Sequence, residues 1–160
     1  MSWTFRIARM TGMLLAATAV SAAEPILTSY PGAEIQVRIY DYAGVSPKTL
    51  ARAKAVASEA LGAAGAHLVW ADCRLRAEDP IKDQACEQPL SPTALHLRLI
   101  DKKMAEAART RNCLGFARHI DGFDWLAAAY VHQAEEMEKR NTAPRAVALG
   151  GIMAHEIRVG

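Results

Sequence analysis

Residues 34–73 read EIQVRIYDYAGVSPKTLARAKAVASEALGAAGAHLVWADC, and they contain the clearest secondary-structure signals in the chain. Residues 34–42 alternate apolar with polar side chains, which predicts a strand with one buried face. Ser46 and Pro47 then provide an N-cap and a proline at the first helical position, so a helix is predicted over 47–63. A second apolar run, AHLVWADC, completes a strand–helix–strand unit.

Further elements follow on the C-terminal side of this unit. We predict strands over 66–73, 94–100 and 113–120, and a short helix over 101–111. The alanines and the Glu and Lys residues of 125–140 favour a helix throughout, and the alternative is a short strand over 129–131 that leads into a helix. A last helix is predicted after a cap at Asn141-Thr142, opened by Pro144. Apolar side chains surround this helix almost completely, so it should be buried.

The order of these elements indicates the fold class. Strands and helices follow one another without an internal repeat or a dividing linker, which is typical of an α/β or α+β domain. We therefore expect a single mixed, mostly parallel sheet packed on helices.

The first 23 residues have the features of a secretory signal peptide. Arg6 and Arg9 form a basic region, residues 10–20 are mostly apolar, and residues 21–23 are small enough for cleavage by a signal peptidase. The alternative is an uncleaved anchor, although the apolar run is short for a membrane span. A cleaved chain would form one domain over 24–160, secreted or periplasmic.

The charge of this domain bears on its partners. The whole chain holds 19 Lys and Arg and 17 Asp and Glu, and removal of the two signal-peptide arginines leaves 17 of each sign. The sequence contains no basic stripe and no acidic tail, so we expect no nucleic acid partner. We also expect no membrane contact beyond the signal peptide, while the oligomeric state stays open.

The three cysteines are Cys73, Cys86 and Cys113. An exported protein meets an oxidising environment, and the polar loop between Cys73 and Cys86 can bring its ends together, so we predict a disulfide between these two. Cys113 would then be a buried or free thiol, and the alternative is that all three are free. No C-x-x-C pair is present, which argues against a zinc ribbon.

The predicted last helix contains a His155-Glu156 pair, which is how a zinc-protease motif begins. In the H-E-x-x-H signature two imidazoles four residues apart hold zinc on one helical face, and the glutamate acts on the metal-bound water. Here Val159 occupies the place of the second histidine, and valine cannot bind zinc. On these residues alone, the pair is a histidine near a helix end beside a solvated glutamate.

Several other segments accompany this pair. They read RIYDYAGVSPKTLARAKAVASEALGAAG, VWADC with its partner Cys86, EQPLSPTALHLRLI, LGFA and AHEI. Together they resemble a family of secreted bacterial proteins of the metzincin type, which are zinc metallopeptidases, over about residues 34–157. The resemblance implies a metzincin-like N-terminal subdomain in which strands and a helix lead to a buried active-site helix.

The resemblance also implies roles for individual residues. His155 would be the first metal ligand and Glu156 the catalytic general base, while Arg158 and Val159 stand where the family has a glycine and its second histidine. The segment of Leu114, Gly115, Phe116 and Ala117 would be an edge strand over the cleft that pairs with an extended peptide or protein substrate. The alternative for this segment is an ordinary strand.

These observations lead us to expect an exported zinc metallopeptidase-like protein. Zinc would be the cofactor of an intact family member. In this sequence the second and third zinc ligands are absent, so we expect a domain that is incomplete at its C-terminus, binds no zinc stably and is inactive. One alternative is an exported, non-catalytic binding module on the same scaffold, and another is a plain α/β domain with an incidental His-Glu pair.

Overall fold

The computed structural model describes residues 32, 34–89, 91, 93–108, 113–119 and 125–159. The elements are β1 (Glu34–Asp41), α2 (Pro47–Gly62), β2 (His67–Asp72), η1 (Gln84–Glu87), β3 (Ala94–Ile100), α3 (Lys102–Ala107), β4 (Gly115–His119), β5 (Trp125–Tyr130), α4 (Val131–Lys139) and α5 (Arg145–Val159). The predicted signal peptide, 1–23, lies outside the described residues.

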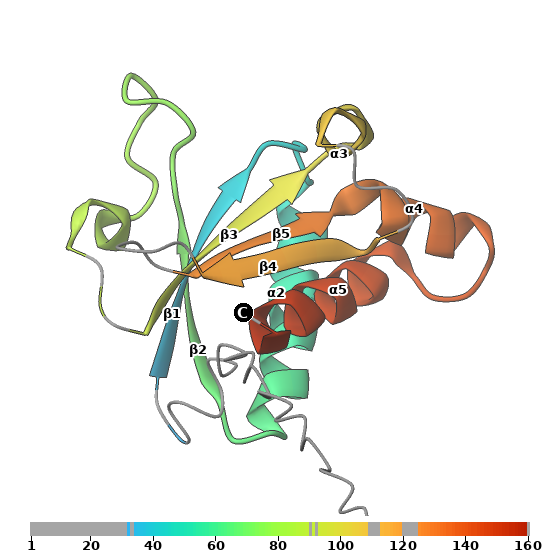
Figure 1. Cartoon of the computed structure of the whole chain (residues 1–160), viewed down its shortest axis with the longest axis horizontal. Coiled ribbons are helices and arrows are strands. Elements are labelled where there is room, and N and C mark those ends of the chain that lie inside the picture. Colours follow the sequence, from blue (N-terminus) through green and yellow to red (C-terminus); the bar gives the residue numbers. More distant parts are fainter. Residues whose placement is uncertain are drawn as a thin grey trace, which may run out of the picture.

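The strands form a five-stranded sheet in the order β2-β1-β3-β5-β4 (Figure 1). Strands β2, β1, β3 and β5 are parallel to one another, and β4 pairs with β5 in the antiparallel direction. The prediction of one mixed, mostly parallel sheet is therefore confirmed.

The predicted strand–helix–strand unit forms as the sequence indicated. Ser46 is the N-cap of α2, where its side-chain oxygen accepts a hydrogen bond from the backbone N–H of Thr49, and Pro47 is the first helical residue. Gly65 follows the helix with a φ of 87°, a left-handed conformation that glycine adopts without strain. The chain then returns along β2, which pairs with β1 in parallel.

Helices α2 and α5 lie together against one face of the sheet (Figure 1). Their contact is close because α5 carries Gly150 at the crossing. A Cβ at this position would lie 2.6 Å from both the carbonyl oxygen of Ala53 and the Cβ of Val56 on α2. The core between these helices and the sheet includes Ile35, Val37, Ile39, Leu95, Leu97, Leu99, Leu149, Ile152, Met153 and Ile157. One side of the last helix is buried as predicted, but Val147 (37%) and Val159 (48%) are exposed, so the helix is not buried all round.

The opposite face of the sheet carries the loop after β2, which the disulfide closes. Cys73 and Cys86 are bonded, with their Cα atoms 5.6 Å apart, as predicted. Arg38 of β1 is 3% exposed, and its guanidinium donates hydrogen bonds to the backbone carbonyls of Cys86 (3.3 Å) and Gln88 (2.8 Å). The loop is thus tied to the sheet twice. Cys113 is exposed and takes no part in the disulfide.

Residues 125–140 differ from the favoured prediction of a helix throughout. They form β5 up to Tyr130 and α4 from Val131, so the strand is also longer than the alternative over 129–131. The strand lies between β3 and β4, and Ala127, Ala128 and Ala129 are almost completely buried there. Pairing on both sides outweighs the helical preference of alanine, because intrinsic propensity is weak beside tertiary contacts.

The start of α5 also differs from the prediction. Asn141 has a φ of 54° and follows the end of α4, where a left-handed residue commonly ends a helix. Asn141-Thr142 is therefore not the cap of α5. Instead the carbonyl of Pro144 accepts the N–H of Ala148, and α5 begins at Arg145. Of the helices that the structure describes, none has the length and hydropathy needed to cross a bilayer.

Candidate functional site

The end of α5 presents His155 and Glu156 in different environments. Glu156 is 3% exposed, whereas His155 is exposed. Val159 lies one turn after His155 on the same helical face and is 48% exposed. The face on which a second zinc-binding histidine would stand is therefore open to solvent, but it carries a valine.

Gly115 of the edge strand β4 lies directly against the side chain of Glu156. A Cβ at Gly115 would come within 2.8 Å of both Cγ and Cδ of Glu156, and it would overlap the backbone carbonyl of Ala128 on β5. Only a residue without a side chain fits between the two elements. The structure therefore brings together two predicted site segments that are far apart in the sequence.

The Glu156 carboxyl is held in a poorly solvated place. Burial raises its pKa, and the nearby His155 lowers it to a smaller extent. Within the described part of the chain, no hydrogen bond or ion pair satisfies this carboxyl. A carboxyl with a raised pKa can accept and release a proton closer to neutral pH than an exposed glutamate can.

In the described part of the chain β4 is an edge strand of the sheet, and its outer side offers main-chain groups to a partner strand. The carbonyl of Leu114 accepts the N–H of Tyr130 at 2.9 Å, so this residue faces β5 in the ladder. Hydrogen bonding alternates along an antiparallel pair, which directs the N–H and C=O of Gly115 and Ala117 away from β5. Leu114 is 36% exposed, and the ring of Phe116 contacts that of Tyr130 with centroids 6.4 Å apart. The residues predicted as a substrate strand thus lie at an open sheet edge.

The side chains near this edge do not fit a zinc ion. A catalytic zinc normally takes three protein ligands, and His155 is the sole imidazole that the end of α5 provides. No group of three His, Cys, Asp or Glu residues suited to a metal was found in the parts of the chain that the structure describes. We therefore derive no chemical step through zinc here.

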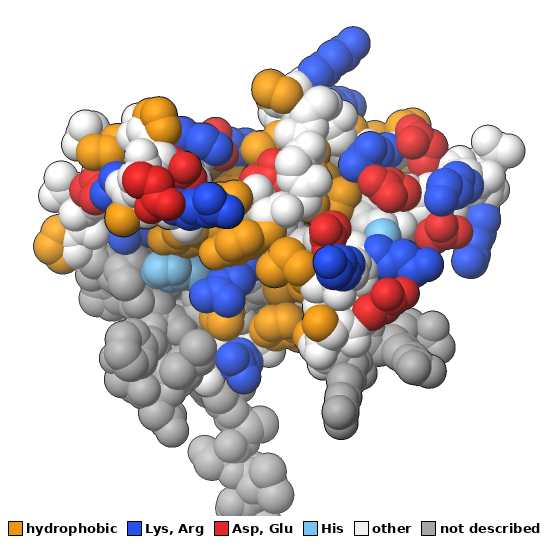
Figure 2. Space-filling view, turned by 90° about the horizontal axis from the view of Figure 1, so that it is seen from above, with side chains coloured by type: hydrophobic (Ala, Val, Ile, Leu, Met, Phe, Trp, Pro, Cys, Tyr) orange, Lys and Arg blue, Asp and Glu red, His pale blue; other side chains and the backbone are white. Residues whose placement is uncertain are grey.

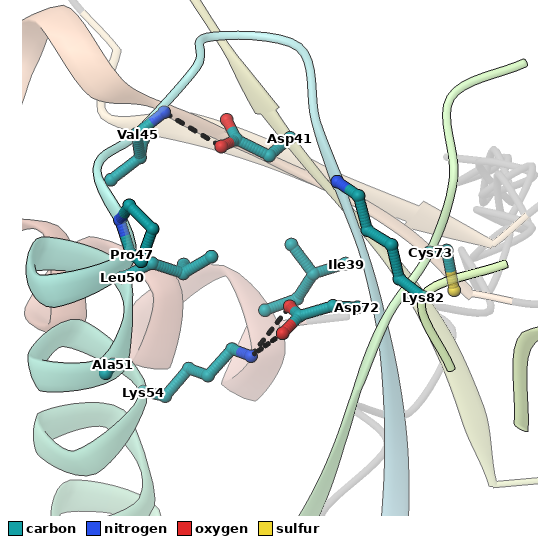
Figure 3. Close-up of a pocket in the computed structure, with 10 residues that line it drawn as sticks. All are labelled: Ile39, Asp41, Val45, Pro47, Leu50, Ala51, Lys54, Asp72, Cys73 and Lys82. Atoms are coloured by element: carbon teal, nitrogen blue, oxygen red, sulfur yellow. Dashed lines mark hydrogen bonds and ion pairs between the residues drawn. The ribbon is translucent and has the colours of Figure 1, made fainter. Parts of the chain in front are cut away.

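Sequence reasoning missed a second place where polar groups converge. A cavity of about 380 Å³ lies between the ends of β1 and β2 and the first turns of α2, and Figure 3 shows Asp41, Lys54, Asp72 and Lys82 around it. The sequence did contain a signal for this cavity, because Asp41 and Asp72 stand at the carboxyl ends of two parallel strands. Ligands commonly bind at this edge of α/β sheets.

The surface charge is mixed on the face that Figure 2 shows. Lys and Arg side chains alternate there with Asp and Glu, and hydrophobic side chains gather between them. Comparison with known proteins gave no match, whether to family models, to curated proteins or to solved structures.

Proposed function

We propose that this chain is an exported protein of the zinc metallopeptidase type whose described residues keep a peptide-binding edge strand and do not hold zinc. The observation that carries the proposal is the contact between Gly115 and Glu156. It joins the LGFA segment to the His-Glu pair, and these are the two segments to which the resemblance assigns substrate binding and catalysis. Such a convergence is not expected of an ordinary strand and an incidental pair.

The open edge of β4 supports peptide binding by strand addition. The outward N–H and C=O groups of Gly115 and Ala117 can pair with an extended peptide, as in other proteins that bind peptides at a sheet edge. Main-chain pairing is tolerant of sequence, so we propose extended peptide segments as the ligand class. Export of the protein is supported by the Cys73–Cys86 disulfide, because such bonds persist in oxidising compartments.

We do not expect this protein to hydrolyse peptides. Glu156 has the burial and the raised pKa that suit a general base, but in zinc peptidases the general base acts on a metal-bound water. Val159 occupies the position of the second metal-binding histidine, so His155 has no partner imidazole one turn further along the helix. We therefore propose that the protein binds peptides without cleaving them.

The test is binding of the purified full chain to an immobilised, reduced and carboxymethylated protein, which stays unfolded and offers many extended segments. Wild-type protein should bind. Ala117→Pro should abolish binding, because it removes an outward N–H, whereas edge strands tolerate proline at such positions and the fold should survive. Lys48→Ala, on the exposed first turn of α2, is the matched control and should bind normally. Unchanged binding by a folded Ala117→Pro variant would rule out the edge strand as the binding site.

A non-catalytic binding module that makes no use of metal is the second candidate. The exposed Val159 in the ligand position favours it. Both candidates predict peptide binding that is identical with and without added zinc. Binding that tightens with zinc would contradict both of them, because it would place a metal at the binding site.

A further inference from the structure

The cavity at the ends of β1 and β2 is separate from the edge strand β4. It lies beside α2 near the β2 edge of the sheet, and β4 forms the opposite edge (Figures 1 and 3). Its volume of about 380 Å³ lies within the range of small-molecule pockets, roughly 300–1,000 Å³. Any ligand of this cavity is therefore independent of the function proposed for β4 and Glu156.

One wall of the cavity is apolar. Ile39 of β1 and Val45, just before α2, are almost completely buried, and Pro47 and Leu50 of α2 continue the wall. Figure 3 shows Leu50 and Ile39 facing each other across the cavity. An aliphatic group of a ligand would lose contact with water here, which favours its binding.

Four charged residues line the cavity. Two of them form an ion pair with each other, and the other two are not bonded to each other. Lys54 donates to both carboxylate oxygens of Asp72 at 2.7 Å, so these two charges are matched. Asp41 accepts the backbone N–H groups of Val45 (2.8 Å) and Ala43 (3.1 Å). These bonds fix the carboxylate at the cavity but bring no positive charge to it. Burial raises its pKa, and those N–H groups lower it to a smaller extent.

Lys82 approaches the cavity from the disulfide-closed loop. Figure 3 shows its ammonium end on the same side of the cavity as the Asp41 carboxylate. Its positive charge acts on Asp41, but no hydrogen bond or ion pair joins Lys82 to any residue that the structure describes. A fixed carboxylate and an unbonded ammonium therefore face the same apolar space.

We propose that this cavity binds a small zwitterion with an apolar side chain, of the α-amino-acid type, with its ammonium on Asp41 and its carboxylate on Lys82. The aliphatic side chain lies against Ile39 and Leu50. The two aspartates and two lysines around the cavity sum to zero charge, so a zwitterion leaves no net charge in it. A simple anion would place its charge beside Asp41 with no compensation, and a simple cation would do the same beside Lys82.

The test is calorimetric titration of the purified full chain with L-leucine. Two further ligands each lack one charge: 4-methylpentanoate has no ammonium group and 3-methylbutylamine has no carboxylate. We expect L-leucine to bind, and each analogue to bind at least about tenfold more weakly, since a charge-assisted hydrogen bond is lost. Absence of leucine binding at about 10 mM, where a ligand of this size should occupy a suitable site, overturns the proposal.

Two lysine variants test whether leucine binds in this cavity. Lys82→Met should weaken leucine binding at least about tenfold and leave the fold intact, because Lys82 is exposed. Lys48→Met is the matched control, since Lys48 is an exposed lysine that does not line the cavity, and it should bind leucine like the wild type. Equal binding of leucine and its two analogues, or unchanged affinity in Lys82→Met, contradicts the proposal.

Discussion

At the residue scale, Gly115 and Glu156 depend on each other. The glycine allows β4 to lie over the buried carboxyl, and the carboxyl owes its poor solvation to that cover. Neither feature is visible in the sequence, where the two residues lie in separate segments. The family resemblance assigned roles to both segments, but only the fold shows that they meet.

Gly115→Ala should therefore destabilise the protein by about 1–3 kcal/mol, the usual cost of overpacking a close contact. The added methyl group would overlap the Ala128 carbonyl, and backbone cannot move aside as a flexible side chain can. Chemical denaturation measures this change in the free energy of unfolding. A stability equal to that of the wild type would show that β4 does not lie on Glu156 as described.

The raised pKa of Glu156 predicts a pH-dependent stability. A carboxyl that holds its proton more tightly when folded stabilises the protein below its unfolded pKa, about 4.3, and this contribution is lost as the pH rises through the folded pKa. Glu156→Gln removes the buried charge, so its melting temperature should exceed that of the wild type near pH 7. The difference should shrink towards pH 4, where wild-type Glu156 is protonated. A difference that is independent of pH would contradict the assignment.

At the element scale, two adjacent glycines in α5 have different roles. Gly150 lies against α2, whereas a Cβ at Gly151 would meet nothing within 4 Å. The sequence shows only a glycine pair that weakens a helix locally. The packing of α5 on α2 decides which of the two is needed.

Gly150→Ala should thus lower the free energy of unfolding by about 1–3 kcal/mol through its clash with Ala53 and Val56. Gly151→Ala, its matched control, should raise the free energy of unfolding by about 1 kcal/mol, because alanine is the better helix former at an open position. Thermal or chemical unfolding of both variants measures these changes in the free energy of unfolding. Similar effects of the two substitutions would contradict the described contact of α2 with α5.

The disulfide and Arg38 together hold the loop after β2 on the sheet. Replacing both Cys73 and Cys86 with serine should lower the free energy of unfolding by about 3 kcal/mol, since a loop of this size gains freedom in the unfolded chain. Denaturation with and without reductant measures the effect. Reductant should destabilise the wild type and leave the double variant unchanged, and equal sensitivity of both would mean that another bond is being reduced.

Most elements were predictable because local signals and burial agree in them. Strand β1 and the Ser46-Pro47 start of α2 are examples, and both form where predicted, although β1 also buries Arg38 on the face predicted to be exposed. Strand β5 was mispredicted because its alanines favour a helix in isolation and become a strand only between β3 and β4. The cavity at Asp41 and Asp72 was missed because neither strand end predicts by itself that α2 leaves space between them.

At the scale of the whole molecule, the sheet places two candidate sites at opposite edges. The proposed peptide-binding edge is β4 with Glu156 beneath it, and the cavity proposed to bind a small zwitterion lies beside β2 and α2. The two sites share no lining residue, so a variant of one should not alter the other. Lys82→Met and Ala117→Pro provide this reciprocal control.

The metallopeptidase-type protein that we propose should lack a zinc site. The most direct measurement is the zinc content of the purified chain after loading with zinc and exhaustive dialysis. A single imidazole with a nearby carboxylate cannot retain the metal as three ligands do, so we predict far less than one zinc per chain. Val159→His, measured alongside, should retain somewhat more because it adds a second imidazole on the same helical face. One tightly held zinc per unmodified chain would show that the protein contains a zinc site after all.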